Sequence, residues 1–474
     1  MTRAVVVGAG PNGLAAAVTL AQHDIAVTVL EAADTVGGGT RTSEPLMPGL
    51  LHDDCAAVHP IALASPYLRS LDLPAHGLQW AWPTVDLAHP LDDGSAGVLV
   101  RSIEQTAQLL GRDGKRWRQL IGPIASGFDD LVEDVLRPVA HLPRHPVKLA
   151  RFGVGAMLPA TVSTRLFRTE QARALFAGNA AHGWYPLSRV STSAMGLMFG
   201  AIAHRHGWPV AVGGSSKITD ALVDVLKGYG AVVETSAPVR ALGDVADADI
   251  VMLDLSPRGI IDLAGNDLPP WISRAYRRYR PAPAAYKVDL AVEGGVPWTN
   301  EYARRAGTLH VCGSAAEVVA AERQIAAGKM PSRPFVLVAQ QYLADPSRSV
   351  GSIHPVYAYA HVPHGYTGDA TDAILAQFER FAPGTRERII AIHARNPAQL
   401  CHDNPNYAGG DIIGGANNPR QLLMRPRIAA NPYATGIPGV FICSASTPPG
   451  AGVHGMCGHN AAQSAIRQLK GGQI

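Results

Sequence analysis

The sequence predicts an α/β protein in which a domain with a parallel sheet is intertwined with an α+β domain that carries a mixed or antiparallel sheet. Three observations predict this fold class. A strand, a glycine turn, a helix and a second strand open the chain over residues 4–31. A second α/β block begins at residue 213. Between residues 284 and 362, apolar strands follow one another with few helices between them, which is typical of a mixed or antiparallel sheet.

The opening segment has the spacing of a dinucleotide-binding turn. Strand Ala4–Val7 leads into Gly8-Ala9-Gly10-Pro11-Asn12-Gly13, and then helix Leu14–Ala21 and strand Ala26–Leu30 precede Glu31. The first glycine permits the tight turn, the second lets the backbone approach a pyrophosphate, and the third lets helix and strand pack closely. The helix N-terminus faces the phosphates, and the acid can accept hydrogen bonds from ribose hydroxyls. A chance glycine turn is the alternative, but strand, helix and acid all fall in register. The expected cofactor contacts of this Rossmann-type unit are Gly8, Gly10, Pro11, Asn12, Gly13 and Glu31.

A second glycine cluster, Gly37-Gly38-Gly39-Thr40-Arg41-Thr42, follows shortly after this acid. Glycine-rich backbone can lie against a flat cofactor, and an arginine can reach its phosphates. The cluster therefore adds four expected contacts: Gly38, Gly39, Thr40 and Arg41. A surface loop is the alternative interpretation, because glycine-rich turns are common.

Composition excludes several classes of protein. The 474 residues are too many for one core and indicate two or three domains, and the 47% hydrophobic and 17% charged residues are those of a soluble globular protein. A net charge of +3 argues against nucleic acid as a partner. The five cysteines are scattered and form no C-x-x-C pair, which argues against a disulfide framework, a zinc site and a redox dithiol. A reduced, cytoplasmic setting is expected.

Targeting and membrane signals are weak. A strand that begins at residue 4 leaves no room for a signal peptide, and no apolar run is long enough to span a bilayer. The stretch Val139–Leu166 mixes arginine and lysine with leucine, valine and methionine. Such a segment can rest on anionic lipid at the inner face of a membrane, and a solvated helix face is the alternative.

The order of predicted elements gives the domain boundaries. Periodicity predicts helices over 103–110, 117–136, 171–180, 191–204, 217–229 and 458–470. Strands are expected over 231–235, 239–242, 250–254, 284–292, 308–312, 335–342, 356–362 and 438–443. The predicted cofactor domain therefore comprises residues 1–65, 206–283 and 430–474, and the substrate domain comprises residues 66–205 and 284–429.

Motifs along the whole chain resemble those of the two-domain FAD-dependent oxidoreductases related to glutathione reductase and amine oxidase. Besides the opening unit, the resembling segments are 55–60, 286–289, 359–363, 404–411 and 444–456. Within this superfamily the chain is most similar to the phytoene-desaturase-related group and is identified with the family of pyridine nucleotide-disulfide oxidoreductase domain-containing protein 2. The family name implies a redox dithiol, which this sequence lacks.

The resemblance implies one non-covalently bound FAD. Residues 50–440 contain no second strand–G-x-G-x-x-G–helix unit, so a separate nicotinamide site is not expected. By the family pattern, Val239 contacts the adenine through its backbone, although plain sheet core is the alternative. The loop before the last helix passes under the flavin, where that helix would stabilise the reduced ring. The contacts expected there are Ser446, Gly452, Val453 and His454.

Three residues are catalytic candidates. Lys287 lies in an apolar strand with Trp298 following at the amine-oxidase spacing, which places it near the flavin; an ion pair with Asp289 is the alternative. His454 and His59 are the other two, and a hydrogen-bonded structural histidine is the default for each. The same default applies to two further candidates for the substrate cavity, His310 and His361. No metal site is expected.

The predicted function is an FAD-dependent oxidoreductase that takes a hydride at flavin N5 from a largely apolar, isoprenoid- or lipid-like substrate. An isomerase or saturase that uses reduced FAD is a second enzymatic hypothesis. A lipid- or partner-binding protein of the GDP-dissociation-inhibitor type is the rival from another class. The intact glycine turn and Glu31 favour retained FAD.

Overall fold

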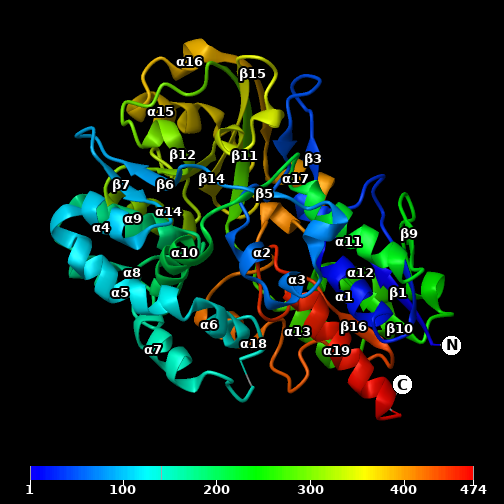
Figure 1. Ribbon diagram of the computed structural model, residues 1–474. Helices are drawn as coiled ribbons and strands as arrows, with labels where there is room; N and C mark the ends of the chain where they lie inside the picture. The colour runs from blue at the N-terminus through cyan, green and yellow to red at the C-terminus, as the bar shows by residue number, and fades with distance from the viewer. Residues whose placement is uncertain (1, 140, 473–474) are drawn as a thin grey trace.

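The computed structural model describes residues 2–139 and 141–472, and two sheets organise it (Figure 1). The first has five parallel strands in the order β16-β10-β1-β2-β9. Parallel strands covered on both faces consist of almost continuous apolar residues, as three of these strands do. Their bounds are β1 (Arg3–Val7), β2 (Ala26–Leu30), β9 (Val232–Glu234), β10 (Ile250–Leu253) and β16 (Val440–Ile442).

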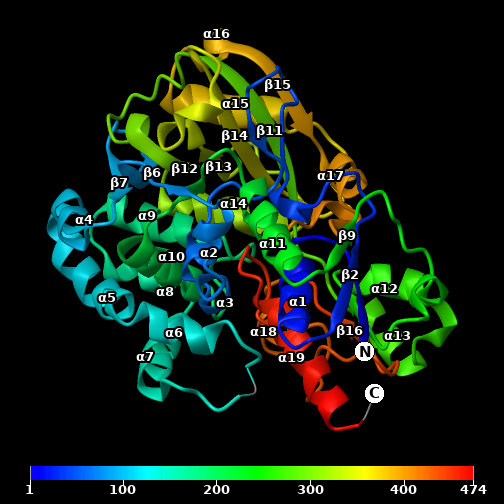
Figure 2. The same ribbon diagram turned by 45° about the vertical axis from the view of Figure 1, so that its right-hand side comes forward.

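Helices from both ends of the chain meet on this sheet. Helix α1 (Pro11–Ala21) packs against α19 (Met456–Lys470) and α11 (Ser216–Gly228), and Figure 2 shows the three side by side. A Cβ at Gly458 would lie 1.8 Å from the backbone oxygen of Asn12, so glycine is required where α19 meets α1. The helices α12 (Pro257–Ala264) and α13 (Pro270–Arg277) follow β10. The predicted glycine turn therefore lies in the middle of a layered α/β unit.

The second sheet has seven strands in the order β15-β11-β14-β13-β12-β6-β7. All its pairs are antiparallel except β12 with β6, so the predicted mixed sheet is confirmed. The strands are β6 (Val85–Pro90), β7 (Ala96–Leu99), β11 (Ala284–Glu293), β12 (Ala306–Val311), β13 (Val336–Ala339), β14 (Ile353–Val362) and β15 (Ile389–Arg395).

A region made of helices packs beside the second sheet (Figure 1). Its helices are α4 (Ile103–Leu109), α5 (Gly114–Ser126), α6 (Phe128–Val135), α7 (Pro146–Ala156), α8 (Ala160–Ser163), α9 (Glu170–Ala181) and α10 (Ser193–His206). Helices α9 and α14 (Ala315–Ala326) pack together next to the sheet. None of the helices in the described part of the chain is both long and apolar enough to cross a membrane.

Further helices and two small ribbons complete the fold. The helices are α2 (Pro60–Ala64), α3 (Pro66–Arg69), α14 (Ala315–Ala326), α15 (Thr371–Phe381), α16 (Thr385–Arg388), α17 (Pro397–Asp403) and α18 (Pro419–Met424). Two small ribbons pair β3 (Thr42–Ser43) with β4 (His52–Asp53), and β5 (Trp80–Ala81) with β8 (Val210–Ala211).

Some element predictions were wrong. The helix expected over 117–136 is broken at Gly127 into α5 and α6. The strand expected over 239–242 is a loop that leads into a 3₁₀ turn, Leu242–Val245. The strand expected over 335–342 ends at Ala339, because a 3₁₀ turn follows it. Local hydrophobicity does not reveal these breaks, which tertiary contacts impose.

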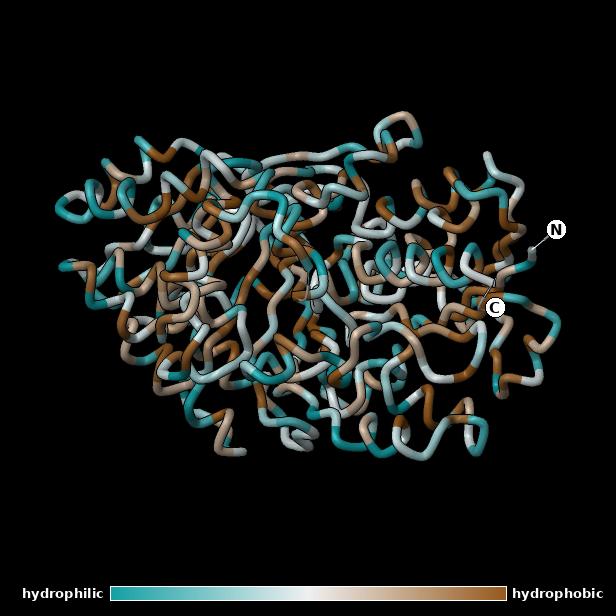
Figure 3. The backbone as a smooth tube through the Cα atoms, turned by 90° about the horizontal axis from the view of Figure 1, so that it is seen from below, coloured by the Kyte–Doolittle hydropathy of each residue, from teal (hydrophilic) through white to brown (hydrophobic). Residues whose placement is uncertain are grey.

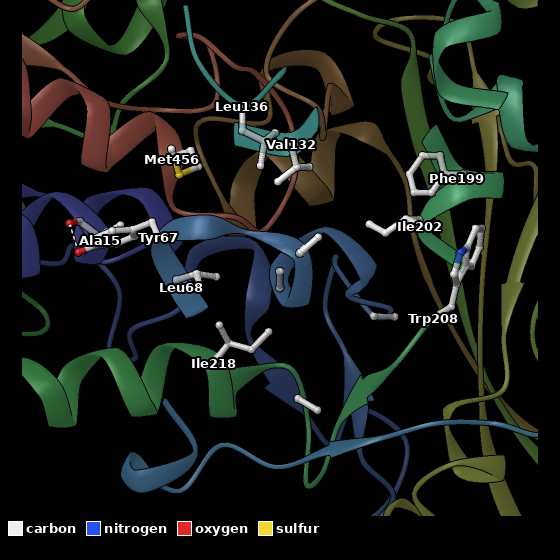
Figure 4. Packing of buried hydrophobic residues seen from close by; sticks show 14 of the residues in the cluster. Ala15, Tyr67, Leu68, Val132, Leu136, Phe199, Ile202, Trp208, Ile218 and Met456 are labelled. Atoms are coloured by element: carbon white, nitrogen blue, oxygen red, sulfur yellow. Dashed lines mark hydrogen bonds between the residues drawn. The ribbon is translucent and has the colours of Figure 1, made fainter. Parts of the chain in front are cut away.

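The largest hydrophobic core joins the two halves of the molecule. Figure 4 shows it around Tyr67, Met456, Val132 and Phe199, which come from four different helices. The Tyr67 hydroxyl donates to the backbone oxygen of Ala15 at 2.9 Å, so its one polar atom is satisfied. In Figure 3 many of the hydrophilic segments lie at the periphery. The two sheets are therefore joined by packed side chains as well as by crossing chains.

Candidate active site

A cavity of about 620 Å³ runs from the glycine turn toward the second sheet. Residues from both sheets line it. Among the residues expected at the site, those that line this pocket are Gly8, Gly10, Pro11, Asn12, Glu31, Gly38, Gly39, Thr40, Arg41, His59, Val239, Ser446, Gly452 and Val453. Three others, Gly13, Lys287 and His454, are outside the lining.

The glycine turn has the close packing that its spacing predicts. A Cβ at Gly13 would lie 2.0 Å from the backbone oxygen of Gly8, so the first turn of α1 rests directly on the end of β1. Pro11 occupies the first turn of the helix, where a missing N–H is tolerated. The side-chain oxygen of Asn12 is buried and has no partner in the described structure. The turn therefore presents backbone and one unsatisfied acceptor at the pocket.

Glu31 directly follows β2 and is positioned by the backbone around it. The N–H of Ala9 donates to one carboxylate oxygen at 2.8 Å, and the N–H of Ala33 donates to the other at 2.9 Å. Arg41 contacts Glu31 at 3.2 Å and donates to the backbone oxygen of Thr35 at 3.0 Å. The carboxylate is thus fixed at the pocket wall, and the arginine expected at the phosphates is its ion-pair partner.

Asp254 is a site residue that we did not predict. It follows β10 directly and lines the pocket, and it accepts a hydrogen bond from the N–H of Gly13 at 2.9 Å. Burial, together with the nearby charge of Glu31, raises its pKa to about 7. The available signal was an acid at the carboxyl end of an apolar strand, the edge at which ligands bind in such sheets.

The loop before α19 forms another part of the pocket. Ser446, Gly452 and Val453 line it, whereas both ring nitrogens of His454 point to backbone groups. The N–H of Met456 donates to its Nδ1 at 3.0 Å, and its Nε2 lies 3.2 Å from the backbone oxygen of Gly450. Burial lowers the pKa of His454 to about 4. In this position the imidazole holds the shape of the loop.

His59 lines the pocket at the start of α2. Its Nε2 lies 2.7 Å from the hydroxyl of Ser215, and its Nδ1 has no partner in the described structure. Burial lowers the pKa of His59 to about 4, although the nearby charge of Asp53 acts to raise it. A neutral imidazole therefore faces the cavity.

Lys287 lies one layer behind the pocket wall. Its ammonium pairs with Asp289 and lies 4.4 Å from the ring centre of Tyr357, and this tyrosine lines the cavity. Asp289 also contacts Arg395 at 3.3 Å. Burial lowers the pKa of Lys287. Trp298 donates to Gln340 at 3.0 Å, away from the pocket lining.

The end of the pocket on the second sheet is aromatic and apolar. Its walls come from β13, β14 and α10 and from the segments beside them, and include Met195, Phe199, Trp208, Leu337, Tyr357, Tyr359 and His182. None of these seven residues was predicted from the sequence. The available signal was the pair of tyrosines, which lie two residues apart on one face of a predicted strand. His310 and His361 are not part of the lining.

Neither a metal nor a dithiol is indicated. Within residues 2–139 and 141–472, no three histidine, cysteine or acidic side chains are grouped as metal ligands would be. The five cysteines are unpaired thiols.

Known proteins agree with this architecture. Residues 6–71 match the NAD(P)-binding Rossmann-like domain family. The chain is 22% identical to pyridine nucleotide-disulfide oxidoreductase domain-containing protein 2 of Rattus norvegicus, and likewise 22% identical to that of Mus musculus; each alignment covers 98% of this chain and 94% of the relative. The predicted relationship is confirmed.

Solved structures share the fold. An oxidoreductase from Methanosarcina mazei matches with a TM-score of 0.62 at 15% identity, over 98% of this chain and 100% of that one. Putrescine oxidase bound to putrescine matches with a TM-score of 0.60 at 17% identity, over 99% of both chains. Cyclohexylamine oxidase from Brevibacterium oxydans matches with a TM-score of 0.58 at 15% identity, again over 99% of both chains. The α/β architecture with a Rossmann-type domain is therefore that of the amine oxidases.

Proposed function

We propose that this protein is an FAD-dependent oxidoreductase that removes a hydride from a largely apolar substrate. The observation that carries the proposal is a single cavity that joins a dinucleotide-binding turn to an aromatic chamber. The oxidoreductase relatives and the fold of the amine oxidases support it. The aromatic end of the pocket suits an isoprenoid- or lipid-like molecule better than a polar one.

The residues at the glycine turn fit the dinucleotide. A Cβ at Gly10 would lie 2.8 Å from the Asp254 carboxylate, so only glycine leaves this backbone open to a pyrophosphate. The unpartnered Asn12 oxygen and the fixed Glu31 carboxylate supply acceptors for hydroxyl groups. The other residues that would hold FAD are Gly38, Gly39, Thr40, Arg41, Val239, Ser446, Gly452 and Val453.

FAD, when bound, would accept the hydride, and the chain's own residues would prepare the substrate for it. The aromatic walls bind and orient an apolar chain and exclude water. His59 is the candidate that lines the cavity, and its Nδ1 is buried without a partner in the described structure. We propose positioning roles for the other two candidates: His454 shapes the loop that contains Gly452, and Lys287 supports Tyr357.

Two observations separate this proposal from its rivals. Yellow purified protein that releases its colour on acid precipitation indicates non-covalent FAD; colourless protein indicates the lipid- or partner-binding class. A protein that converts substrate only with reduced FAD and no net electron transfer would be the isomerase, and net reduction of the substrate would indicate the saturase. Colour that stays with the pellet would contradict non-covalent binding.

Glu31→Ala tests the cofactor site. Hydrogen bonds to a charged group contribute about 1.5–3 kcal/mol each, so losing the carboxylate should weaken FAD binding at least about tenfold. Fluorescence titration of the apoprotein with FAD measures this. Glu104→Ala, an exposed acid on α4, is the matched control and should leave the dissociation constant unchanged. An unchanged constant for Glu31→Ala would mean that the ribose is held elsewhere.

We also propose peripheral contact with an anionic membrane surface through residues 141–166. Helix α7 exposes Val147 and Val154 by 80% and 76%, on one face of the helix with Arg151 between them. The basic charge is smaller than the sequence suggested, because Lys148 pairs with Asp130 and Arg144 with Glu133. Apolar side chains would therefore dominate this contact.

A further inference from the structure

His182 is a polar residue at the aromatic end of the pocket. It follows α9 directly and lines the cavity. Its ring centre lies 4.5 Å from that of Phe199 and 5.8 Å from that of Trp208. An imidazole is therefore held between apolar rings, where substrate would contact it.

His310 fixes the orientation of this imidazole. The Nε2 atoms of His182 and His310 are 2.8 Å apart, and His310 is fully buried on β12. A Cβ at Gly178 would lie 2.4 Å from Nδ1 of His310, so the backbone of α9 presses on the second ring and keeps it in place. The Nε2 atom of His182 is thus occupied by its hydrogen bond with His310. The Nδ1 atom of His182 has no hydrogen-bond partner in the described structure. Burial lowers the pKa of His182 to about 3, so the imidazole is neutral at ordinary pH.

No carboxylate lines the aromatic end of the pocket. The carboxylates that line it are Glu31 and Asp254 at the glycine turn, and Asp403, which lies 3.5 Å from Arg395. The buried acid Glu322 is outside the lining and lies 2.7 Å from Nδ1 of His361. Tyr357 donates its hydroxyl to the backbone of Cys55. The aromatic end therefore offers neutral polar groups and no carboxylate for a cation.

We propose that His182 determines substrate specificity by hydrogen-bonding, through Nδ1, to an uncharged hydroxyl group on an otherwise apolar substrate. A hydroxyl both donates and accepts, so it satisfies either tautomer of the ring. A protonated amine would lose its hydration without gaining a counter-charge. The pocket thus selects an apolar alcohol over an alkylammonium ion, although amine oxidases share its fold. The inference rests on the proposed function only in taking this cavity as the substrate site.

Equilibrium dialysis of the purified holoprotein at neutral pH tests the inference with octanol, octylamine and octyl fluoride as probes. The wild-type protein should bind octanol about fivefold more tightly than either of the others, the effect of about one hydrogen bond. His182→Phe should bind octanol and octyl fluoride equally. His182→Gln, which keeps a polar group, should retain most of the preference. His23→Phe, an exposed histidine on the cofactor domain, is the control and should behave as wild type.

Two results would overturn the inference. One is a wild-type protein that does not bind octanol more tightly than octylamine, a result that needs no variant. The other is a His182→Phe protein that still prefers octanol over octyl fluoride. The colour of the purified protein is recorded separately. A colourless protein would overturn the proposed redox function, but the dialysis measurements would still decide the role of His182.

Discussion

Asn406 donates its side-chain N–H to the backbone oxygen of Asp254 at 2.9 Å, although 152 residues separate the two. Its side-chain oxygen accepts from the N–H of Ser256 at 2.7 Å. The Asn406 side chain thereby makes the backbone hydrogen bonds that a neighbouring strand would make just beyond the end of β10. Through this contact the loop between α17 and α18 closes over the edge of the parallel sheet, where the pocket begins.

Asn406→Ala should loosen this closure. The change leaves a backbone N–H and C=O without their partner, which costs about 1–3 kcal/mol when such groups are buried. The free energy of unfolding, measured in urea, should fall by that amount, and the cofactor should dissociate faster. Asn266→Ala, at an exposed position in a surface turn, should change neither quantity. Wild-type stability in Asn406→Ala would mean that other contacts hold the loop.

The raised pKa of Asp254 should make stability fall with pH. Its pKa is about 7 in the folded protein against 3.8 for the ordinary group. Between these values the folded chain holds a proton that the unfolded chain has released, so the free energy of unfolding decreases as pH rises, by up to about 1.4 kcal/mol per pH unit. Above pH 7 the effect is complete.

Asp254→Asn should remove that part of the pH dependence, because an amide does not titrate. Urea unfolding of both proteins over this pH range gives the difference, in which contributions from other groups cancel. The variant should gain in stability relative to wild type as pH rises toward 7. A difference that does not depend on pH would show that Asp254 is ionised throughout.

Lys287→Met should destabilise the fold. Removing one partner of a buried ion pair costs about 3 kcal/mol or more, and Asp289 would keep His52, His393 and Arg395 as partners. Lys217→Met removes an exposed pair with Asp220 and should cost less than about 1 kcal/mol.

Stopped-flow reoxidation of the reduced protein by oxygen measures whether Lys287 also acts on the cofactor. If its charge influences the flavin, Lys287→Met should reoxidise more slowly than wild type with FAD equally bound. Equal rates, combined with lower stability, would assign the residue to structure alone.

The exposed face of α7 should bind anionic vesicles. Wild-type protein should co-sediment with phosphatidylglycerol vesicles, and the double change Val147→Asp and Val154→Asp should reduce binding several-fold, because it replaces apolar area by charge. Ile390→Asp, at an exposed position on β15, is the control and should bind as wild type. Failure of the wild-type protein to sediment would contradict the membrane contact.

By itself, the sequence determined the elements whose signals are local. The turn at Gly8, Gly10 and Gly13, the acid at Glu31 and the long apolar strands were all predictable, because tight turns, close packing and buried strands each need particular residue types at fixed spacing. A mixed or antiparallel second sheet was also predictable from the run of strands.

Only the tertiary structure decided which distant residues line the pocket. His182, Tyr357 and Asp254 come from segments far apart in the sequence, and no local pattern shows that they share one cavity. The same holds for Lys287 and His454: a lysine in a strand and a histidine before a helix look alike whether they face a cofactor or a partner. Burial, and the neighbour each atom finds, follow from the crossing of the chain between two sheets, which local spacing does not encode.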